Sequence, residues 1–143
     1  MSFDLQLFNG DLVIQNGDLG TVQDTNKLVQ DILKICLTPV GANPLQPWYG
    51  SFISRSLIGS SLSTDITLQI AQTQLQNAIQ NLITLQQKQL KSYQKVSAAE
   101  HISSILSINV ARNITDPRTY QVKIKVASKA LTPITVPFTV LNI

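Results

Sequence analysis

The chain has 143 residues, of which 43% are hydrophobic, and its mean hydropathy is +0.12. These values indicate one globular domain with a core and exclude the class of disordered proteins. No apolar run approaches the ~18 residues of a membrane span, and the start, Met1-Ser2-Phe3-Asp4, lacks the basic residues of a signal peptide. The single Cys36 cannot form an internal disulfide, which fits a reducing compartment.

The net charge of +3 is unevenly distributed along the chain. Residues 1–65 carry three basic and six acidic side chains, whereas residues 88–129 carry eight basic and two acidic ones. Such a basic half can bind nucleic acid, or it can face the acidic side of a neighbouring subunit. Because the lysines alternate with apolar residues, as outward positions of strands do, solvated strand faces are a third interpretation.

The N-terminal segment, FDLQLFNGDLVIQNGDLGTVQD, contains two Asn-Gly steps, each followed by Asp-Leu. Asn-Gly is the strongest short signal for a β-hairpin, because both residues accept the positive φ of a type I′ turn. We therefore expect short strands near 3–8, 11–15 and 19–22, forming an N-terminal β-hairpin region within residues 1–24.

A helix is predicted over 26–37, NKLVQDILKICL, with Asp24 or Thr25 as its N-cap. Apolar residues cover most of its circumference, so we expect it to be largely buried. Pro39 disfavours helix at the residue before it and ends the element. Cys36 lies among the apolar positions, and with no His placed locally to activate it, we expect a buried structural thiol.

The segment that follows, TPVGANPLQPWYGS (38–51), contains three prolines, two glycines, a tyrosine and the only tryptophan of the chain. Prolines and glycines at this density predict a loop with a defined path. An active-site rim, a ligand clamp and an assembly surface would each explain a tryptophan in such a loop.

A long helix is predicted over 65–91, DITLQIAQTQLQNAIQNLITLQQKQLK, capped by Ser63 or Thr64. Asp65 at its start and Lys88 and Lys91 at its end complement the helix macrodipole. At 1.5 Å per residue it would be ~40 Å long, more than a domain of this size needs. Its polar face is rich in glutamine, which a partner can cover without desolvating a charge, although a solvated face is equally compatible.

From about residue 101 the pattern changes to a period of two, which predicts three amphipathic strands in HISSILSINVAR, TYQVKIKVAS and ITVPFTV. Pro137 cannot donate to a ladder, so the last strand should lie at an edge or carry a bulge, and an open edge is a docking site for another chain. The expected inward residues are Ile102, Leu106, Ile108 and Val110, then Tyr120, Val122, Ile124 and Val126, then Ile134, Val136, Phe138 and Val140.

Residues that carry catalytic chemistry are few. The single His101 and single Glu100 are adjacent, with His101 expected on the polar side of its strand. No set of His and Cys has the spacing of a zinc site, no pair of carboxylates is singled out for glycoside cleavage, and no phosphate-binding glycine motif is present. We expect no enzymatic activity, no metal and no cofactor.

The segment DTNKLVQDILKICLTPVGANPLQPWYGS resembles the small baseplate wedge proteins, or sheath initiators, of contractile-tailed phages, whose equivalents occur in type VI secretion systems. In that family a helix runs into a Leu-x-Thr-x-x-Gly loop and then a Pro-x-Tyr-Gly-Ser step. The positions that match are Leu37, Thr38, Gly41, Pro47, Tyr49, Gly50 and Ser51. A second family mark, a Glu-Pro-Arg triplet ahead of the final strands, is matched with an acid-for-acid change by Asp116-Pro117-Arg118.

The resemblance implies a single α+β domain over 1–143, in which a small antiparallel sheet within 100–143 packs with the short buried helix and the long helix of 25–91. It also implies a structural protein of the virion, which is assembled in the host cytoplasm into the tail baseplate. There the protein would link the wedge core to the first sheath ring and initiate sheath assembly by strand exchange. The implied partners are other wedge proteins, which the long helix would contact, and the sheath protein, with tube or hub proteins as further candidates and no membrane. The residues expected to contact partners are Trp48, Tyr49, Arg118, Lys123, Lys125, Ile134, Val136 and Phe138.

Two other functions are compatible with the sequence. One is nucleic-acid binding through the basic half. An argument against it is that the lysines are not interleaved with exposed aromatic residues, which would stack on bases. The other is a lysozyme-like hydrolase of the tail. The sequence leaves open the machine, the copy number, the partner of each face, and the continuity of the long helix through Ser92-Tyr93-Gln94.

Overall fold

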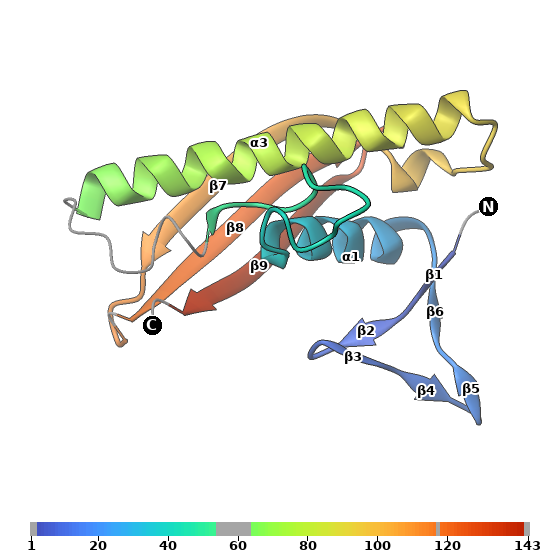
Figure 1. The fold of residues 1–143 in the computed structure, drawn as a ribbon, viewed down its shortest axis with the longest axis horizontal. Coiled ribbons are helices and arrows are strands. Elements are labelled where there is room, and N and C mark those ends of the chain that lie inside the picture. The colour runs from blue at the N-terminus through green and yellow to red at the C-terminus, as the bar shows by residue number, and fades with distance from the viewer. Residues whose placement is uncertain (1–2, 54–63, 117, 142–143) are drawn as a thin grey trace.

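The computed structural model describes residues 3–53, 64–116 and 118–141, in which two α-helices cover one face of a three-stranded antiparallel sheet (Figure 1). The strand order is β7-β8-β9; α1 packs against β9, and α3 packs against β7 and α1. These elements are α1 (Asp24–Leu37), α3 (Thr64–Lys91), the 3-10 helix η1 (Ala98–Glu100), β7 (Ile102–Arg112), β8 (Thr119–Ser128) and β9 (Pro133–Leu141). The α+β class predicted from the sequence is confirmed.

Residues 4–22 form six two-residue strands, which we call the three-cornered unit (Figure 1, lower right). Its strands are β1 (Asp4–Leu5), β2 (Leu7–Phe8), β3 (Asp11–Leu12), β4 (Ile14–Gln15), β5 (Asp18–Leu19) and β6 (Thr21–Val22), paired as β1 with β6, β2 with β3 and β4 with β5. Both predicted turns are confirmed, since φ is 50° at Asn9, 81° at Gly10, 51° at Asn16 and 80° at Gly17.

Each of the three strands expected in this region is divided into two short strands, at Gln6, Val13 and Gly20 respectively. Backbone hydrogen bonds join these residues in a ring: Gln6 donates to the carbonyl of Gly20 (2.8 Å), Gly20 to that of Val13 (2.7 Å), and Val13 to that of Gln6 (3.1 Å). The three residues are seven positions apart, as are the Asp-Leu steps that begin at 4, 11 and 18. The unit is therefore a three-fold repeat of seven residues, of which the sequence pattern revealed only the two Asn-Gly turns.

The core lies between the sheet and the two helices. Alternate residues of β8 face inward, and their neighbours in β9 share that face: Val126 pairs with Ile134, and Ile124 pairs with Val136. The buried side chains from the helices are Leu28, Ile32, Ile35 and Cys36 of α1 and Ala71, Leu75, Ala78, Ile79 and Leu82 of α3. Cys36 is buried as predicted, and burial raises the pKa of its thiol to about 12.

The inward set predicted for β7 is partly wrong. Leu106 is 51% exposed, and Ile105 packs against the core in its place. The register between β7 and β8 shifts between Ile102 and Ser104 and again between Ile105 and Ser107. At each irregularity β7 has one residue more than β8, so the residues after it point to the opposite face from the one that strict alternation gives. A prediction based on a period of two therefore fails from that point.

The predicted N-cap of α1 and the predicted position of His101 are also wrong. The N-cap residue is Gln23, which makes no side-chain capping bond; instead, the carboxylate of Glu100 accepts a hydrogen bond from the backbone N–H of Asp24 at 3.2 Å. His101 is only 3% exposed and lies between η1 and β7. Contacts between segments far apart in the sequence produce both arrangements, so local patterns could not reveal them.

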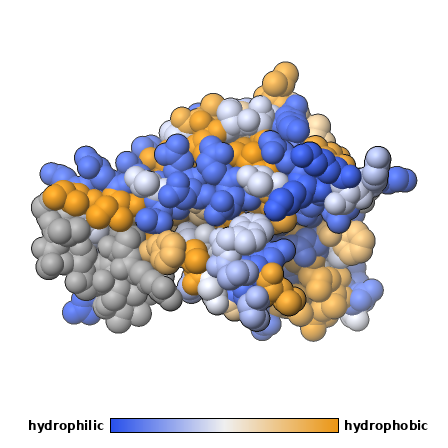
Figure 2. Space-filling view, turned by 45° about the horizontal axis from the view of Figure 1, so that its top comes forward, coloured by the Kyte–Doolittle hydropathy of each residue, from blue (hydrophilic) through white to orange (hydrophobic). Residues whose placement is uncertain are grey.

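The predicted long helix is confirmed and ends at Lys91. Tyr93 has a φ of 59°, so the helix does not continue through Ser92-Tyr93-Gln94. Of its two predicted N-caps, Ser63 lies outside the described residues, as does the side chain of Thr64. Figure 2 shows a largely hydrophilic band of side chains along this helix, on the side away from the sheet.

Candidate partner interface

The strand β9 is the first part of the candidate interface, because in the described part of the chain it pairs only with β8 and leaves its other edge open. This agrees with the edge position predicted from Pro137. The opposite edge strand, β7, carries two register shifts, which disrupt regular pairing with an added strand. The more regular open edge is therefore that of β9.

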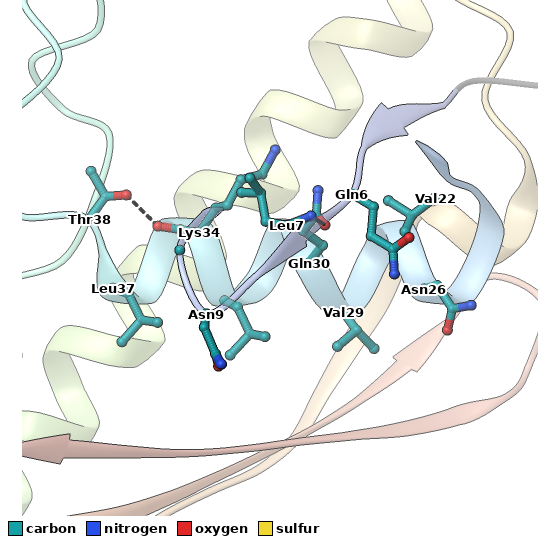
Figure 3. Close-up of a pocket in the computed structure, with 12 residues that line it drawn as sticks. Gln6, Leu7, Asn9, Val22, Asn26, Val29, Gln30, Lys34, Leu37 and Thr38 are labelled. Carbon is teal, nitrogen blue, oxygen red and sulfur yellow. Dashed lines mark hydrogen bonds between the residues drawn. The ribbon is translucent and has the colours of Figure 1, made fainter. Parts of the chain in front are cut away.

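A groove of ≈ 640 Å³ runs between α1 and the three-cornered unit. Its apolar lining includes Val29, Leu33 and Leu37 of α1. Figure 3 shows Val29 and Leu37 pointing away from the helix on the side where β9 passes, and α1 packs against β9. A chain added beside β9 would therefore meet an apolar surface at the flank of α1.

The side chain of Gln30 joins the three-cornered unit to α1. Gln30 is 8% exposed; its Oε1 accepts a hydrogen bond from the backbone N–H of Leu7 (2.9 Å), and its Nε2 donates to the carbonyl of Leu5 (2.8 Å) and to Asp4 (3.0 Å). The amide thus binds the outward backbone groups on both sides of Gln6. Figure 3 shows Gln30 on the side of α1 that faces this segment.

Charged side chains support the same junction. Lys34 forms an ion pair with Asp4 and lies 3.5 Å from Asp31, which also pairs with Lys27 at 2.9 Å. Burial by itself would raise the pKa of the Asp4 carboxyl, but the hydrogen bond and charge of Lys34 lower it below the ordinary value. Burial would likewise lower the pKa of Lys34, and its hydrogen bond to Asp4 with the charge of Asp31 raises it.

The loop of residues 38–51, which we call the Trp loop, is folded back onto the helices. The Trp48 ring packs edge-to-face on Tyr49 with centroids 6.2 Å apart, and Lys88 Nζ of α3 lies 5.8 Å from the Trp48 centroid. Tyr49 packs against the core, whereas Trp48 stays 39% exposed. The loop therefore holds Trp48 in a fixed place on the surface beside α3.

The matched loop residues explain how this path is fixed. At Gly50 φ is +118°, and a Cβ there would lie 2.4 Å from the carbonyl oxygen of Thr38. Only glycine allows this approach, which lets Ser51 donate from its N–H to the same carbonyl (2.9 Å) and from its hydroxyl to the carbonyl of Cys36. The Tyr-Gly-Ser step thus ties the loop to the C-terminal end of α1.

The other predicted contact residues fall in different places. Lys123 and Lys125 are exposed on the outer face of the sheet, whereas Arg118 lies exposed in the turn between β7 and β8, where its backbone N–H donates to Asp116 (3.0 Å). The side chains of Ile134 (6% exposed) and Val136 (0%) are in the protein's own core, and Phe138 is half-buried against it. Because backbone groups alternate in direction along a strand, these three residues face β8 where the nitrogen of Pro137 faces the open edge, so a chain added beside β9 would meet the backbone of Thr135 and Thr139 instead.

Sequence reasoning missed an apolar face on the three-cornered unit. Leu7 pairs with Leu12, Ile14 with Leu19, and Leu5 with Thr21, and paired residues share one side of a ribbon. All five aliphatic side chains are exposed, Ile14 by 72%. The signal that would have found this face is the seven-residue spacing of the Asp-Leu steps.

Glu100 and His101, which lie outside these surfaces, are buried within the fold. Glu100 is 1% exposed and accepts hydrogen bonds from Asp24 and from the N–H of Ser97 (3.3 Å). Burial, together with the charge of Lys129, lowers the pKa of His101. Among residues 3–53, 64–116 and 118–141, no three His, Cys, Asp or Glu side chains form a group able to hold a metal ion, and no helix there has the length and apolarity of a membrane span.

Comparison with known proteins gives a match at the level of structure. No family model matches the chain, and no curated protein matches it. A crystal structure from Geobacter sulfurreducens, described as a "putative tail lysozyme", superposes with a TM-score of 0.59 over 81% of this chain and 88% of that one, at 14% sequence identity. The chain therefore shares its fold with that protein.

Proposed function

We propose that the protein is a non-enzymatic structural component of a contractile phage tail baseplate. It would link the wedge core to the first sheath ring and initiate sheath assembly by strand exchange, and its location would be the virion, after assembly in the host cytoplasm. The observation that carries this proposal is the open edge of β9 beside the apolar groove of α1. Support comes from the fold shared with the protein described as a "putative tail lysozyme", which points to a phage tail, and from the loop motif that ends in Tyr49-Gly50-Ser51.

Pro137 of β9 suggests which backbone groups would bind a sheath strand. A proline is tolerated in a strand where its nitrogen faces away from the neighbouring strand. Because backbone groups alternate in direction along a strand, Thr135 and Thr139 would point their N–H groups to the same open edge as Pro137. Both threonines are exposed. A strand of the sheath protein would accept hydrogen bonds from these two residues.

Other surfaces would bind wedge proteins. The apolar face of the three-cornered unit and the exposed part of Trp48 are large apolar surfaces of the kind that protein contacts cover. Lys123 and Lys125 would pair with acidic groups of a neighbour, with Arg118 contributing from its turn. Tube or hub proteins are further candidate partners.

The absence of enzymatic activity is part of the proposal, because a tail hydrolase is the main alternative. Glycoside cleavage needs a carboxylic acid that reaches the substrate. Glu100 is 1% exposed and binds backbone N–H groups, so it is badly placed for this role. Zymography on peptidoglycan tests the point: we expect no cleared band, and clearing by the purified protein would contradict a purely structural role.

The binding test is co-expression with neighbouring candidate sheath and wedge genes, followed by pull-down. Truncation after Thr132 is unsuitable, because it removes the buried Ile134, Val136 and Val140. The better variant is Thr135→Pro with Thr139→Pro, which removes two outward N–H donors; its control is Thr135→Ala with Thr139→Ala, which keeps them. We expect sheath capture by the wild type and the alanine variant only.

Two outcomes of this experiment would contradict the proposal. Equal capture of sheath protein by the proline and alanine variants would show that the β9 edge is not the docking site. Capture of no tail protein by the wild type would reject the baseplate assignment. In that case DNA binding with a steep salt dependence would be measured next, because Lys123 and Lys125 share an exposed face.

A further inference from the structure

The outer side of α3 carries a stripe of polar, uncharged side chains opposite its core residues. The helix has no charged residue between Asp65 and Lys88. The hydroxyls of Thr73 and Thr84 donate to the carbonyls of Gln69 and Gln80 in the preceding turn, both at 3.0 Å. The stripe, all of it exposed, consists of Gln69, Thr73, Gln76, Gln80, Thr84 and Gln87.

This stripe reads the same in both directions along the helix. The order Gln-Thr-Gln-Gln-Thr-Gln is a palindrome of residue types; its four glutamines are placed symmetrically about the level of Ala78, whereas Thr73 and Thr84 are five and six residues from it. Gln76 and Gln80 are each two residues from Ala78, and Gln69 and Gln87 are each nine residues from it. Residues equidistant from a central level lie at mirror-related angles about the stripe, since each residue turns the helix by about 100°. A two-fold rotation that makes two such helices antiparallel therefore brings each of these glutamines to the level of its counterpart in the second copy.

The ends of the helix extend the same symmetry with complementary chemistry. Asp65 and Lys91 are each thirteen residues from Ala78, and both are exposed. Ile66 and Leu90 are each twelve residues from it, and they are exposed by 47% and 41%. An antiparallel neighbour of the same sequence would thus bring a lysine to the level of each aspartate and a leucine to the level of each isoleucine. An isologous interface requires such self-complementarity.

We propose that two copies of the chain associate through this stripe, with their α3 helices antiparallel and a two-fold axis at the level of Ala78. Glutamine amides donate and accept hydrogen bonds, so Gln76 of one copy and Gln80 of the other satisfy each other across the axis. Ion pairs between Asp65 and Lys91 lie at both ends. The partner of the stripe is then a second copy of the chain, and not the wedge protein that we expected from the glutamine-rich pattern. The dimer proposal does not depend on the baseplate proposal.

The first test uses charge reversal in the full-length protein, measured by sedimentation at increasing concentration. Asp65→Lys puts two lysines together at each end of the pair, and Lys91→Asp puts two aspartates together. We expect wild type to dimerise with rising concentration and each single variant to dimerise about tenfold more weakly or worse. An equimolar mixture of the two variants restores opposite charges at both ends, so it should form heterodimers as tightly as the wild type.

A matched control separates pairing from net charge and folding. Lys95→Asp changes the net charge as Lys91→Asp does, but Lys95 is exposed outside α3, so dimerisation should be unchanged. Rescue in the mixture also excludes misfolding as the cause of weak association by the single variants. A wild type that stays monomeric at every concentration reached, or a mixture no better than the single variants, would overturn the proposal.

The second test fixes the direction of the helices by cross-linking. Cysteines at position 80 of an antiparallel pair are about 6 Å apart along the helix axis, whereas cysteines at position 69 are about 27 Å apart. A short bis-maleimide should therefore cross-link Gln80→Cys and leave Gln69→Cys uncoupled. The native Cys36 is buried and does not compete. Equal cross-linking of both variants would indicate a parallel pair and contradict the assignment.

Discussion

The buried carboxylate of Glu100 accepts a hydrogen bond of 3.2 Å from the backbone N–H of Asp24, so a residue after the long helix caps the start of the short one. Two further contacts reinforce the junction: the Ser97 hydroxyl donates to Asp24 (2.8 Å), and the Gln86 amide donates to the carbonyl of Glu100 (2.9 Å). The amide oxygen of Gln86 accepts from Ile102 N–H at 3.0 Å, which connects α3 to the first residue of β7. The positions of α1, α3 and the sheet are therefore coupled through one connected group of polar residues, of which Glu100 and Gln86 are buried.

The first prediction concerns this cap. Glu100→Ala removes the acceptor of the part-buried N–H groups of Asp24 and Ser97 and should lower the free energy of unfolding by about 2 kcal/mol. Glu100→Gln keeps one acceptor oxygen and the side-chain volume, so its loss should be about 1 kcal/mol. Urea unfolding followed by circular dichroism measures both values. Equal losses for the two variants would show that the carboxylate does not act as the cap.

The second prediction concerns pH. His101 is the single histidine of the chain, its Nε2 has no hydrogen-bond partner within residues 3–53, 64–116 and 118–141, and burial lowers its pKa in the folded state. Below the unfolded value of about 6.5, the unfolded chain binds a proton that the native state does not. Stability should therefore be constant above that value and fall as the pH drops through it, continuing until the lower native pKa is reached.

The matched variant for this prediction is His101→Gln. It removes the only group expected to titrate between pH 7 and pH 5, so its stability should be nearly independent of pH there, whatever its absolute value. Urea unfolding at several pH values makes the comparison. The same fall in the wild type and the variant would assign the effect to another group.

The third prediction compares two glycines of the Trp loop, both with positive φ. A Cβ at Gly41 (φ +87°) meets open space, whereas one at Gly50 (φ +118°) would lie 2.4 Å from the Thr38 carbonyl oxygen. Gly41→Ala should cost about 1 kcal/mol from backbone strain alone, and Gly50→Ala should cost about 3 kcal/mol or more. Thermal unfolding gives the ranking. Tryptophan fluorescence should change only for Gly50→Ala, since Trp48 is held by this part of the loop.

The fourth prediction concerns the attachment of the three-cornered unit. Gln30→Ala removes hydrogen bonds to Leu7, Leu5 and Asp4 and should cost about 2 kcal/mol. The loss should be local, so hydrogen exchange should accelerate at the Leu7 amide and remain slow in β8. Unchanged exchange at Leu7 would mean that the unit is held by other contacts.

The parts of the fold that local patterns encode were predictable. The Asn-Gly turns, the long helix and the alternating strands each depend on residues close in sequence, and each is confirmed by the structure. The errors fall where distant segments meet: Glu100 replaces the expected cap of α1, His101 is buried beside η1, and two irregularities move Leu106 outward. None of these contacts leaves a periodic signal.

The candidate interface was also predictable only in part. Pro137 correctly marked β9 as an edge strand, because a missing N–H is a local property. The groove beside α1 and the apolar face of the three-cornered unit depend on how a seven-residue repeat closes on itself, which requires the hydrogen-bonded ring of Gln6, Val13 and Gly20. The contact roles of Trp48, Tyr49, Arg118, Lys123 and Lys125 stay predictions.

The measurement that tests the central claim most directly is hydrogen exchange of the protein alone and in complex with the sheath protein. If the sheath strand adds to the open edge, the amides of Thr135 and Thr139 should become strongly protected in the complex, while those along β7 exchange as before. Protection confined to other surfaces, with Thr135 and Thr139 unchanged, would contradict docking at β9 and with it the proposed role in sheath initiation.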